Sequence, residues 1–181
     1  TVRKNILEEI KDSPSPGVWY PDLRVWLHYY QEWNDWHPYP STLPSNVVKA
    51  LNKSLSIIEK EGIEKRLETL KEVSRKVVES VRILGLDTFI DEDSIAHGLT
   101  AVSTLGKFDA SEFVDFLKEK FLIQVGGSLD KKMKPLVIRI GHMTTKQYQT
   151  RNLMAVIGAM GVFLKIKGHK VQLDSAINKL M

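Results

Sequence analysis

The 181-residue sequence contains no cysteine, and this absence removes several kinds of chemistry at once. Disulfides, cysteine-ligated zinc, iron–sulfur clusters and thiol catalysis are all excluded. No apolar run reaches the roughly 20 residues that a membrane span needs, so we expect no membrane partner. The N-terminus has neither an initiator methionine nor the apolar core of a signal peptide. These features fit a cytoplasmic protein.

The sequence also lacks a strong excess of charge. Its 26 basic residues against 22 acidic ones give a net charge of +4, and no run reaches five like charges. The densest positive spot comprises Lys131, Lys132 and Lys134. A nucleic-acid surface usually needs a continuous basic stripe. We therefore interpret this spot as a solvated loop and expect no nucleic-acid partner.

Familiar catalytic and metal-binding motifs are missing as well. There is no G-x-S-x-G segment for a hydrolase nucleophile. The five histidines are scattered without an H-x-x-x-H pair, so we expect no metal site. The acidic residues 91–93 lack the spacing of a calcium loop, which favours a solvated loop there.

The composition that remains, 43% hydrophobic and 27% charged, is typical of a soluble globular protein. In residues 1–45 the spacing predicts a helix over 3–12 and a second helix opened by Pro21 in its first turn. All four tryptophans lie between Trp19 and Trp36. So many large rings in a short arm indicate that the arm packs on another surface.

Residues 46–85 predict a long connecting helix. Apolar residues recur at three and four positions, are interrupted at Gly62, and resume up to Leu84. We expect the helix to be bent or broken near Gly62 and to end at Gly85 in a left-handed cap.

Residues 86–181 predict a small domain in which the periodicity changes. The element order β-β-α-β-β-α indicates an antiparallel or mixed sheet with helices on one face, an α/β (α+β) fold. Asp109 is the expected cap of the first helix. The expected strands are 86–90, 99–105, 122–125 and 136–140, and the expected helices are 110–120, 146–167 and 171–180.

Three features could carry chemistry. Tyr39 and Thr42 precede a helix N-terminus, where their hydroxyls suit a phosphate. The residues alone favour the structural interpretation, a helix cap at Thr42 or Ser45 with Tyr39 packed in the core. Arg139 lies in an apolar strand, where it needs a carboxylate partner, either a ligand or a structural acid. Gly126 and Gly127 form either a tight turn or a close backbone approach to a ligand.

Six short motifs occur in a fixed order over nearly the whole chain. They are residues 20–23 (YPDL), 39–44 (YPSTLP), 61–62 (EG), 84–86 (LGL), 126–127 (GG) and 139–143 (RIGHM). Together they resemble the C-terminal part of class V aminotransferases that depend on pyridoxal phosphate, the serine–pyruvate and alanine–glyoxylate group. Each motif is modest alone, and the six in register carry the resemblance.

The resemblance implies a role for each candidate. Arg139 would hold the α-carboxylate of a small amino acid or keto acid, and Tyr39 and Thr42 would reach the cofactor phosphate of the neighbouring subunit in a homodimer. Gly126 and Gly127 would lie in a substrate-side loop. The resemblance also implies that residues 1–45 end the large domain of the fold-type-I architecture and that residues 86–181 form its small domain.

The resemblance implies an absence too. The Schiff-base lysine would lie upstream of Thr1 in a missing N-terminal domain, and Lys4, which starts a predicted helix, does not match it. We therefore expect a fragment that is inactive alone. Thr144 and Leu129 stand where the family often has glycine, which affects the shape of the substrate-side loop. The alternative is a stand-alone, non-catalytic remnant that dimerises or binds small carboxylates.

Overall fold

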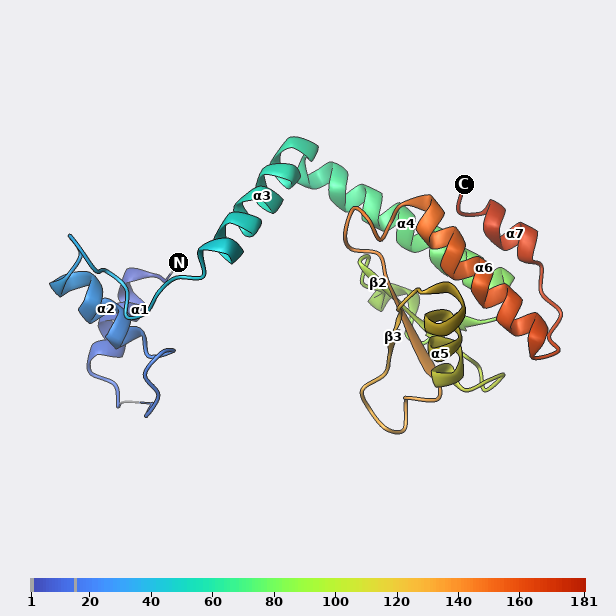
Figure 1. Cartoon of the computed structure of the whole chain (residues 1–181), viewed down its shortest axis with the longest axis horizontal. Coiled ribbons are helices and arrows are strands. Elements are labelled where there is room, and N and C mark those ends of the chain that lie inside the picture. Colours follow the sequence, from blue (N-terminus) through green and yellow to red (C-terminus); the bar gives the residue numbers. More distant parts are fainter. Residues whose placement is uncertain (1, 15) are drawn as a thin grey trace. The chain divides into compact units, whose positions relative to one another are not determined.

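The structure is a computed structural model that describes residues 2–14 and 16–181, and it contains two compact units, residues 1–57 and 58–181 (Figure 1). In the first unit, α1 (Lys4–Lys11) and α2 (Leu23–Glu32) contact each other. The predicted place of Pro21 is wrong, because Asp22 is the N-cap of α2 and its carboxylate accepts a hydrogen bond from the Arg24 amide. Pro21 therefore lies just outside the helix.

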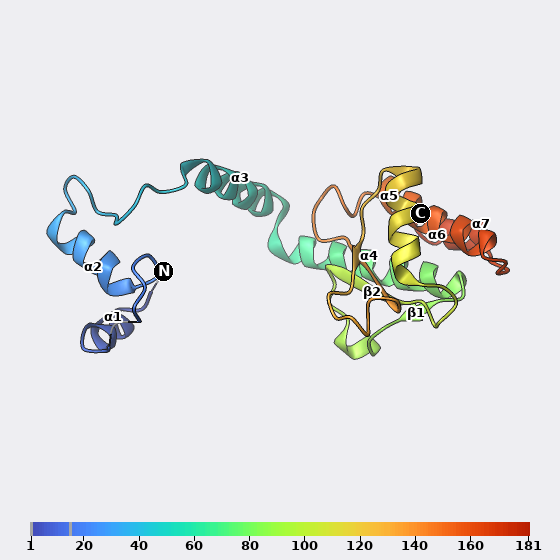
Figure 2. The ribbon, with the colours of Figure 1, turned by 60° about the horizontal axis from the view of Figure 1, so that its bottom comes forward.

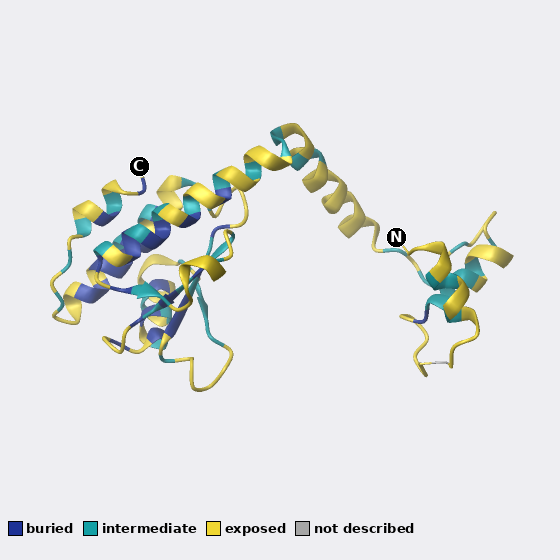
Figure 3. Cartoon of the chain, turned by 180° about the vertical axis from the view of Figure 1, so that it is seen from behind, coloured by how far each residue is buried: buried dark blue, intermediate teal, exposed yellow. Residues whose placement is uncertain are grey.

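Aromatic rings contact one another along α2 and the turn that follows it. The rings of Tyr29 and Trp33 meet edge to face with centroids 4.5 Å apart, and Trp36 stacks on His37. Trp36 is nevertheless 71% exposed. Among the described residues of this unit only Asp22 and Pro40 are buried (Figure 3), so the rings contact one another without forming a closed core.

The predicted long helix is broken where the sequence indicated. α3 (Ser45–Glu61) ends just before Gly62, and α4 (Ile63–Ile83) begins just after it (Figure 2). Gly62 has φ +87°, which a residue with a side chain adopts only with strain. Glu61 then bonds the Arg66 guanidinium at 2.7 Å and the Tyr148 hydroxyl at 3.3 Å, so the break is tied to the loop after the last strand.

The end of α4 confirms the predicted glycine cap. Gly85 has φ +81°, its amide donates to the Arg82 carbonyl, and the next amide, that of Leu86, donates to the Val81 carbonyl. This pair of hydrogen bonds is the Schellman arrangement, which satisfies carbonyl groups that the helix end would leave unpaired. The chain then turns into the first strand.

The second unit holds a four-stranded antiparallel sheet in the order β1-β2-β4-β3. An antiparallel sheet is one of the two kinds that the sequence predicted. Thr100 and Val102 pair with Ile140 and Ile138, and all four side chains are buried. Because side chains alternate across a strand, Arg139 lies on the opposite, partly open face. The strands are β1 (Asp87–Thr88), β2 (Leu99–Ser103), β3 (Gly126–Gly127) and β4 (Val137–Gly141).

Helices cover the buried face of the sheet. α4, α5 (Ala110–Phe121) and α6 (Thr150–Ile166) join it in one hydrophobic core, and α7 (Leu173–Asn178) packs on α4 and α6. The rings of Phe108 and Phe113 both contact Phe163, with centroids 5.1 and 5.4 Å away. Asp109 caps α5 as predicted, by accepting from the Ser111 amide at 2.7 Å.

Most element boundaries differ from the predictions by one or two residues, and two elements differ by more. The strand predicted at 122–125 is wrong, because Leu122 ends α5 in a left-handed conformation and the glycines after Val125 are themselves the paired strand β3. The predicted start of the next helix is also too early. Residues 144–148 form turns held by bonds between Thr144 and Gln147, and α6 begins at Thr150.

Candidate carboxylate-binding site

Arg139 occupies the middle of β4, between two residues that have little or no side chain. Its cross-strand partner on β2 is Ala101, and its partner on β3 is Gly126. Directly paired side chains on one face of a sheet lie within contact distance. Small neighbours on both sides therefore leave the arginine side chain room on the open face.

One end of the Arg139 side chain is fixed by the backbone. Its Nε donates a hydrogen bond of 2.8 Å to the Gly127 carbonyl. Within residues 2–14 and 16–181 no carboxylate lies within 4.0 Å of the guanidinium, so the structural ion pair that the sequence left open is not formed among them. The two terminal nitrogens keep donors for another group.

Gly126 lies close against this guanidinium. A Cβ atom built at Gly126 would lie 3.3 Å from Nε and 3.4 Å from one terminal nitrogen of Arg139. A Cβ at Gly127 would meet no atom within 4 Å. The two predicted glycines thus lie against Arg139 in different ways. Gly127 accepts a hydrogen bond at its carbonyl, and Gly126, which has no Cβ, leaves the space above its Cα atom open to the Arg139 side chain.

A cavity of about 430 Å³ adjoins Arg139. Apolar side chains line it from the sheet, from the segment before β3 and from α6, and most of its polar side chains come from the loop before α6 and the first turn of α6. Arg139 also borders a second cavity of about 390 Å³ with Gly127 and Ser128. The first cavity is lined by Ile123, Val125, Leu153 and Val156 among the apolar residues, and by Gln124, Lys146, Gln147 and Asn152 among the polar ones.

His142, just after β4, is a residue that sequence reasoning missed. Its ring is fully buried, and Nε2 lies 2.9 Å from the Thr100 hydroxyl. Nδ1 has no hydrogen-bond partner among the described residues. Burial is the main cause that lowers the pKa of His142 to about 4, so the imidazole is neutral near pH 7. His142 therefore joins the ends of β2 and β4 as an uncharged group.

Tyr39 and Thr42 lie in the first unit. Thr42 is exposed in the segment before α3, and Tyr39 is 43% exposed on the wall of an apolar groove of about 360 Å³ beside α1 and α2. Neither hydroxyl has a partner among the described residues, so the predicted cap at Thr42 is not formed with them. Both hydroxyls are therefore available to a ligand.

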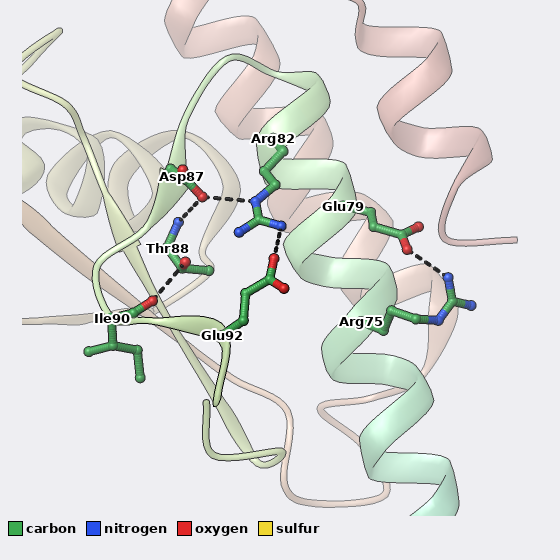
Figure 4. Close-up of polar contacts among 7 residues, drawn as sticks. All are labelled: Arg75, Glu79, Arg82, Asp87, Thr88, Ile90 and Glu92. Atoms are coloured by element: carbon green, nitrogen blue, oxygen red, sulfur yellow. Dashed lines mark hydrogen bonds and ion pairs between the residues drawn. The ribbon is translucent and has the colours of Figure 1, made fainter. Parts of the chain in front are cut away.

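The acidic segment after β1 has a partner that the sequence did not indicate. Arg82 of α4 donates from Nε to Asp87 at 2.8 Å and from a terminal nitrogen to Glu92 (Figure 4). The Arg82 guanidinium holds the pKa of the Asp87 carboxyl below its usual range, chiefly through this hydrogen bond. Among the described residues no cluster of histidine and acidic side chains could hold a metal ion.

The lysine-rich spot near residue 132 lies in an exposed turn, in which the Asp130 carboxylate accepts from two following amides. None of the described helices is long and apolar enough to cross a membrane.

Comparison with known proteins agrees with the motif order. No protein-family model matches the chain. An uncharacterized aminotransferase of Methanocaldococcus jannaschii is 26% identical over 172 residues, which is 95% of this chain and 43% of that protein. Alanine–glyoxylate aminotransferase 1 of Saccharomyces cerevisiae is 29% identical over 74% of this chain and 35% of its own length.

Solved structures give the same result for the fold. Ureidoglycine–glyoxylate aminotransferase from Bacillus subtilis matches with a TM-score of 0.83 at 20% identity, over 99% of this chain and 46% of that one. Alanine–glyoxylate aminotransferase from Nostoc matches with a TM-score of 0.77 at 22% identity, over 91% and 42%.

The chain matches the C-terminal part of class V aminotransferases. The predicted resemblance is thereby confirmed. The chain spans less than half the length of these relatives. A further relative has a different description, the soluble hydrogenase 42 kDa subunit of Anabaena cylindrica, 27% identical over 87% of this chain and 42% of that protein.

Proposed function

We propose that this chain supplies the substrate-carboxylate site of a pyridoxal-phosphate-dependent aminotransferase. The reaction would move an amino group between a small amino acid, of the alanine or serine type, and a 2-keto acid such as glyoxylate or pyruvate. The observation that carries the proposal is the Arg139 guanidinium, held at Nε but without a carboxylate partner among the described residues. Alanine and glyoxylate appear in the names of two similar proteins.

Arg139 would bind the α-carboxylate that amino acids and 2-keto acids share. Its planar fork forms two parallel hydrogen bonds to a carboxylate, which fixes orientation as well as affinity. The Gly127 carbonyl already fixes the plane of the fork through Nε. Gly126 and Gly127 would border the bound substrate from β3, as expected of a substrate-side loop.

The cofactor would be held partly by Tyr39 and Thr42. Pyridoxal phosphate, when bound, supplies the electron sink that makes amino-group transfer possible. The residues present fit its phosphate, because two exposed hydroxyls without partners among the described residues lie just before the N-terminus of α3, which favours anions. The proposal assigns them to the phosphate of the neighbouring subunit in a cytoplasmic homodimer.

The proposal assigns the Schiff-base lysine to a large domain outside this chain. Lys4 is the first residue of α1, as the sequence predicted, and α1 has no buried residue. Incubation of this chain with pyridoxal phosphate and borohydride should leave no lysine labelled at stoichiometric yield. A single trapped lysine would overturn this assignment and the expected inactivity of the chain alone.

The carboxylate role is tested by Arg139→Ala in an enzyme that contains this chain joined to a large domain. Loss of both charge-assisted hydrogen bonds should raise KM for the amino donor by roughly 100-fold, at about 1.5 kcal/mol for each bond. The Kd for pyridoxal phosphate should change less than about twofold, because Arg139 makes no cofactor contact in the proposal. Equal weakening of substrate and cofactor would contradict the assignment.

The alternative is a stand-alone module that binds small carboxylates or dimerises without catalysis. The observation that favours it is the self-contained core of residues 58–181, which includes the Arg139 strand. Under this alternative the chain binds pyruvate through Arg139 but gains no transferase activity when the large domain of a relative is added. Recovery of activity in that mixture would favour the enzyme.

A further inference from the structure

We propose that Gly126 is a positioning residue for Arg139: its missing side chain lets the guanidinium lie flat against β3, with both terminal nitrogens turned toward a carboxylate. This inference rests on the proposed function of Arg139 and adds a residue that acts through it. Gly126 is the direct cross-strand partner of Arg139, so their side-chain positions share one face of the sheet.

Backbone conformation does not explain why residue 126 is glycine. The described glycines with positive φ are Gly17, Gly62, Gly85, Gly106 and Gly168, and neither Gly126 nor Gly127 is among them. Any residue could adopt the backbone of β3 at these two positions. Glycine within a strand otherwise weakens it, since it offers no side chain for packing. The reason for glycine therefore lies in the space around the residue.

That space is filled by Arg139. A Cβ at Gly126 would lie 3.3 Å from Nε, 3.4 Å from the Arg139 Cβ and 3.4 Å from a terminal nitrogen. These distances are shorter than ordinary van der Waals contacts of about 3.5 to 4.0 Å. An alanine here would push the guanidinium off the strand by a few tenths of an ångström. The bond from Nε to the Gly127 carbonyl would lengthen with it.

The two glycines restrain the guanidinium in complementary ways. The Gly127 carbonyl fixes Nε, and the bare Cα of Gly126 lets the planar group approach the strand. An arginine side chain otherwise has several rotatable bonds, and ordering them on binding weakens affinity. A guanidinium that is oriented before the ligand arrives binds a carboxylate with less loss of freedom.

The experiment is a pyruvate titration of the full 181-residue chain, followed by NMR through the Nε–Hε signal of Arg139. This signal is assigned as the one that Arg139→Ala removes. Gly126→Ala is expected to raise the Kd for pyruvate about tenfold, which corresponds to loss of one of the two charge-assisted bonds. It should also speed exchange of the Hε proton with water, because the bond to Gly127 weakens.

Gly127→Ala is the matched comparison. It places the same methyl group on the adjacent residue of β3, where a Cβ meets no atom within 4 Å. Its effect on the Kd for pyruvate should therefore be much smaller than that of Gly126→Ala. Equal effects of the two substitutions would show that the strand needs glycine in general, and would contradict the positioning role.

A double-mutant cycle tests the same contact without any ligand. In the parent chain, Gly126→Ala should lower the urea midpoint at least about twice as much as the same substitution does in a chain that already carries Arg139→Ala. The reason is that removing the arginine removes the contact. If Gly126→Ala folds only together with Arg139→Ala, the inference also holds. Equal losses in both backgrounds, or failure to fold in both, would overturn it.

The outcomes separate the inference from the proposed function. Pyruvate binding that Arg139→Ala abolishes but Gly126→Ala leaves intact would reject the positioning role and keep the carboxylate site. Pyruvate binding that survives Arg139→Ala, or none in the parent chain, would reject the carboxylate site. In that case the double-mutant cycle still decides whether Gly126 positions Arg139.

Discussion

The two units of this chain differ in how they use their apolar residues. Every residue of the buried hydrophobic core lies between Leu70 and Leu180, in the second unit. The first unit holds all four tryptophans, and Trp19 and Trp36 are more than half exposed. Burial of apolar area is the main stabilising term in folding. Residues 58–181 therefore have a hydrophobic core of their own on which to fold, whereas residues 1–57 have little.

The two units should differ most in how much the free energy of unfolding falls when an aromatic side chain is removed. Phe113→Ala removes a fully buried ring from the contacts of α5 with α6 and should lower the free energy of unfolding by about 3 to 5 kcal/mol. Trp36→Ala, at a ring 71% exposed, should change it by less than about 0.5 kcal/mol. Urea unfolding followed by circular dichroism measures both changes.

Tryptophan fluorescence sharpens this test, because it reports the first unit alone. In the parent chain the fluorescence change should come at lower urea than the change in circular dichroism. Phe113→Ala should move the second transition and leave the first in place. A single transition seen by both signals would contradict this difference between the units. Equal losses of unfolding free energy from the two substitutions would contradict it as well.

A second expected difference between the units is the pH dependence of the free energy of unfolding. Burial lowers the pKa of His142 to about 4 from the ordinary 6.5, so the unfolded chain binds a proton that the folded chain does not take up between these two pH values. The free energy of unfolding should therefore be constant above pH 6.5 from this source and fall as the pH drops toward 4, by about 3 kcal/mol in total.

His142→Gln, which cannot titrate, should flatten this pH dependence, and urea midpoints across the same pH range measure it. His169→Gln is the control, since His169 is only half-buried beside the Lys107 carbonyl. An unchanged pH slope in His142→Gln would show that the buried ring is not the source. The tryptophan signal of the first unit should not follow the His142 titration.

The smallest expected effect is at the surface. Arg82→Ala removes the guanidinium that Asp87 and Glu92 share (Figure 4) and should lower the free energy of unfolding by less than about 1 kcal/mol, since all three side chains are more than a third exposed. The contribution of the Asp87 carboxylate to the free energy of unfolding is fully present above the ordinary carboxyl pKa. It is lost as the pH falls below that value toward the lower pKa of the folded chain.

Arg75→Ala is the control for this substitution, because Arg75 pairs with Glu79 within α4 and does not reach β1. High salt should shrink the effect of Arg82→Ala by screening exposed charges. An effect that salt leaves unchanged would show that packing of the arginine stem, and not its charge, holds β1 to α4.

Much of the fold could be predicted because local signals agree with it. The Gly62 interruption, the Gly85 cap and the Asp109 cap each depend on a few neighbouring residues, and the structure places each as expected. β3 could not be placed, because a strand made of two glycines has no side-chain alternation. The start of α6 was misplaced because Thr144 and Gln147 close a turn that resembles a helix start.

In the candidate site too, the residues marked by a local signal were predictable, and the contacts that depend on the tertiary fold were not. Arg139 was identifiable from the sequence as a charge within an apolar strand. Gly126 was also a candidate, but its pairing and that of Ala101 with Arg139 could not be predicted, because the pairing of β2 and β3 with β4 depends on register across the sheet. The burial of His142 likewise depends on tertiary packing around Thr100.

A comparison of pyruvate with pyruvamide tests whether Arg139 is a carboxylate-binding group. The two molecules have nearly the same shape, and only pyruvate carries the charged carboxylate that the guanidinium pairs with. Pyruvate should shift the Arg139 Nε–Hε signal saturably, and pyruvamide should not. Equal shifts from both molecules, or no shift from either, would contradict the carboxylate-binding role of Arg139.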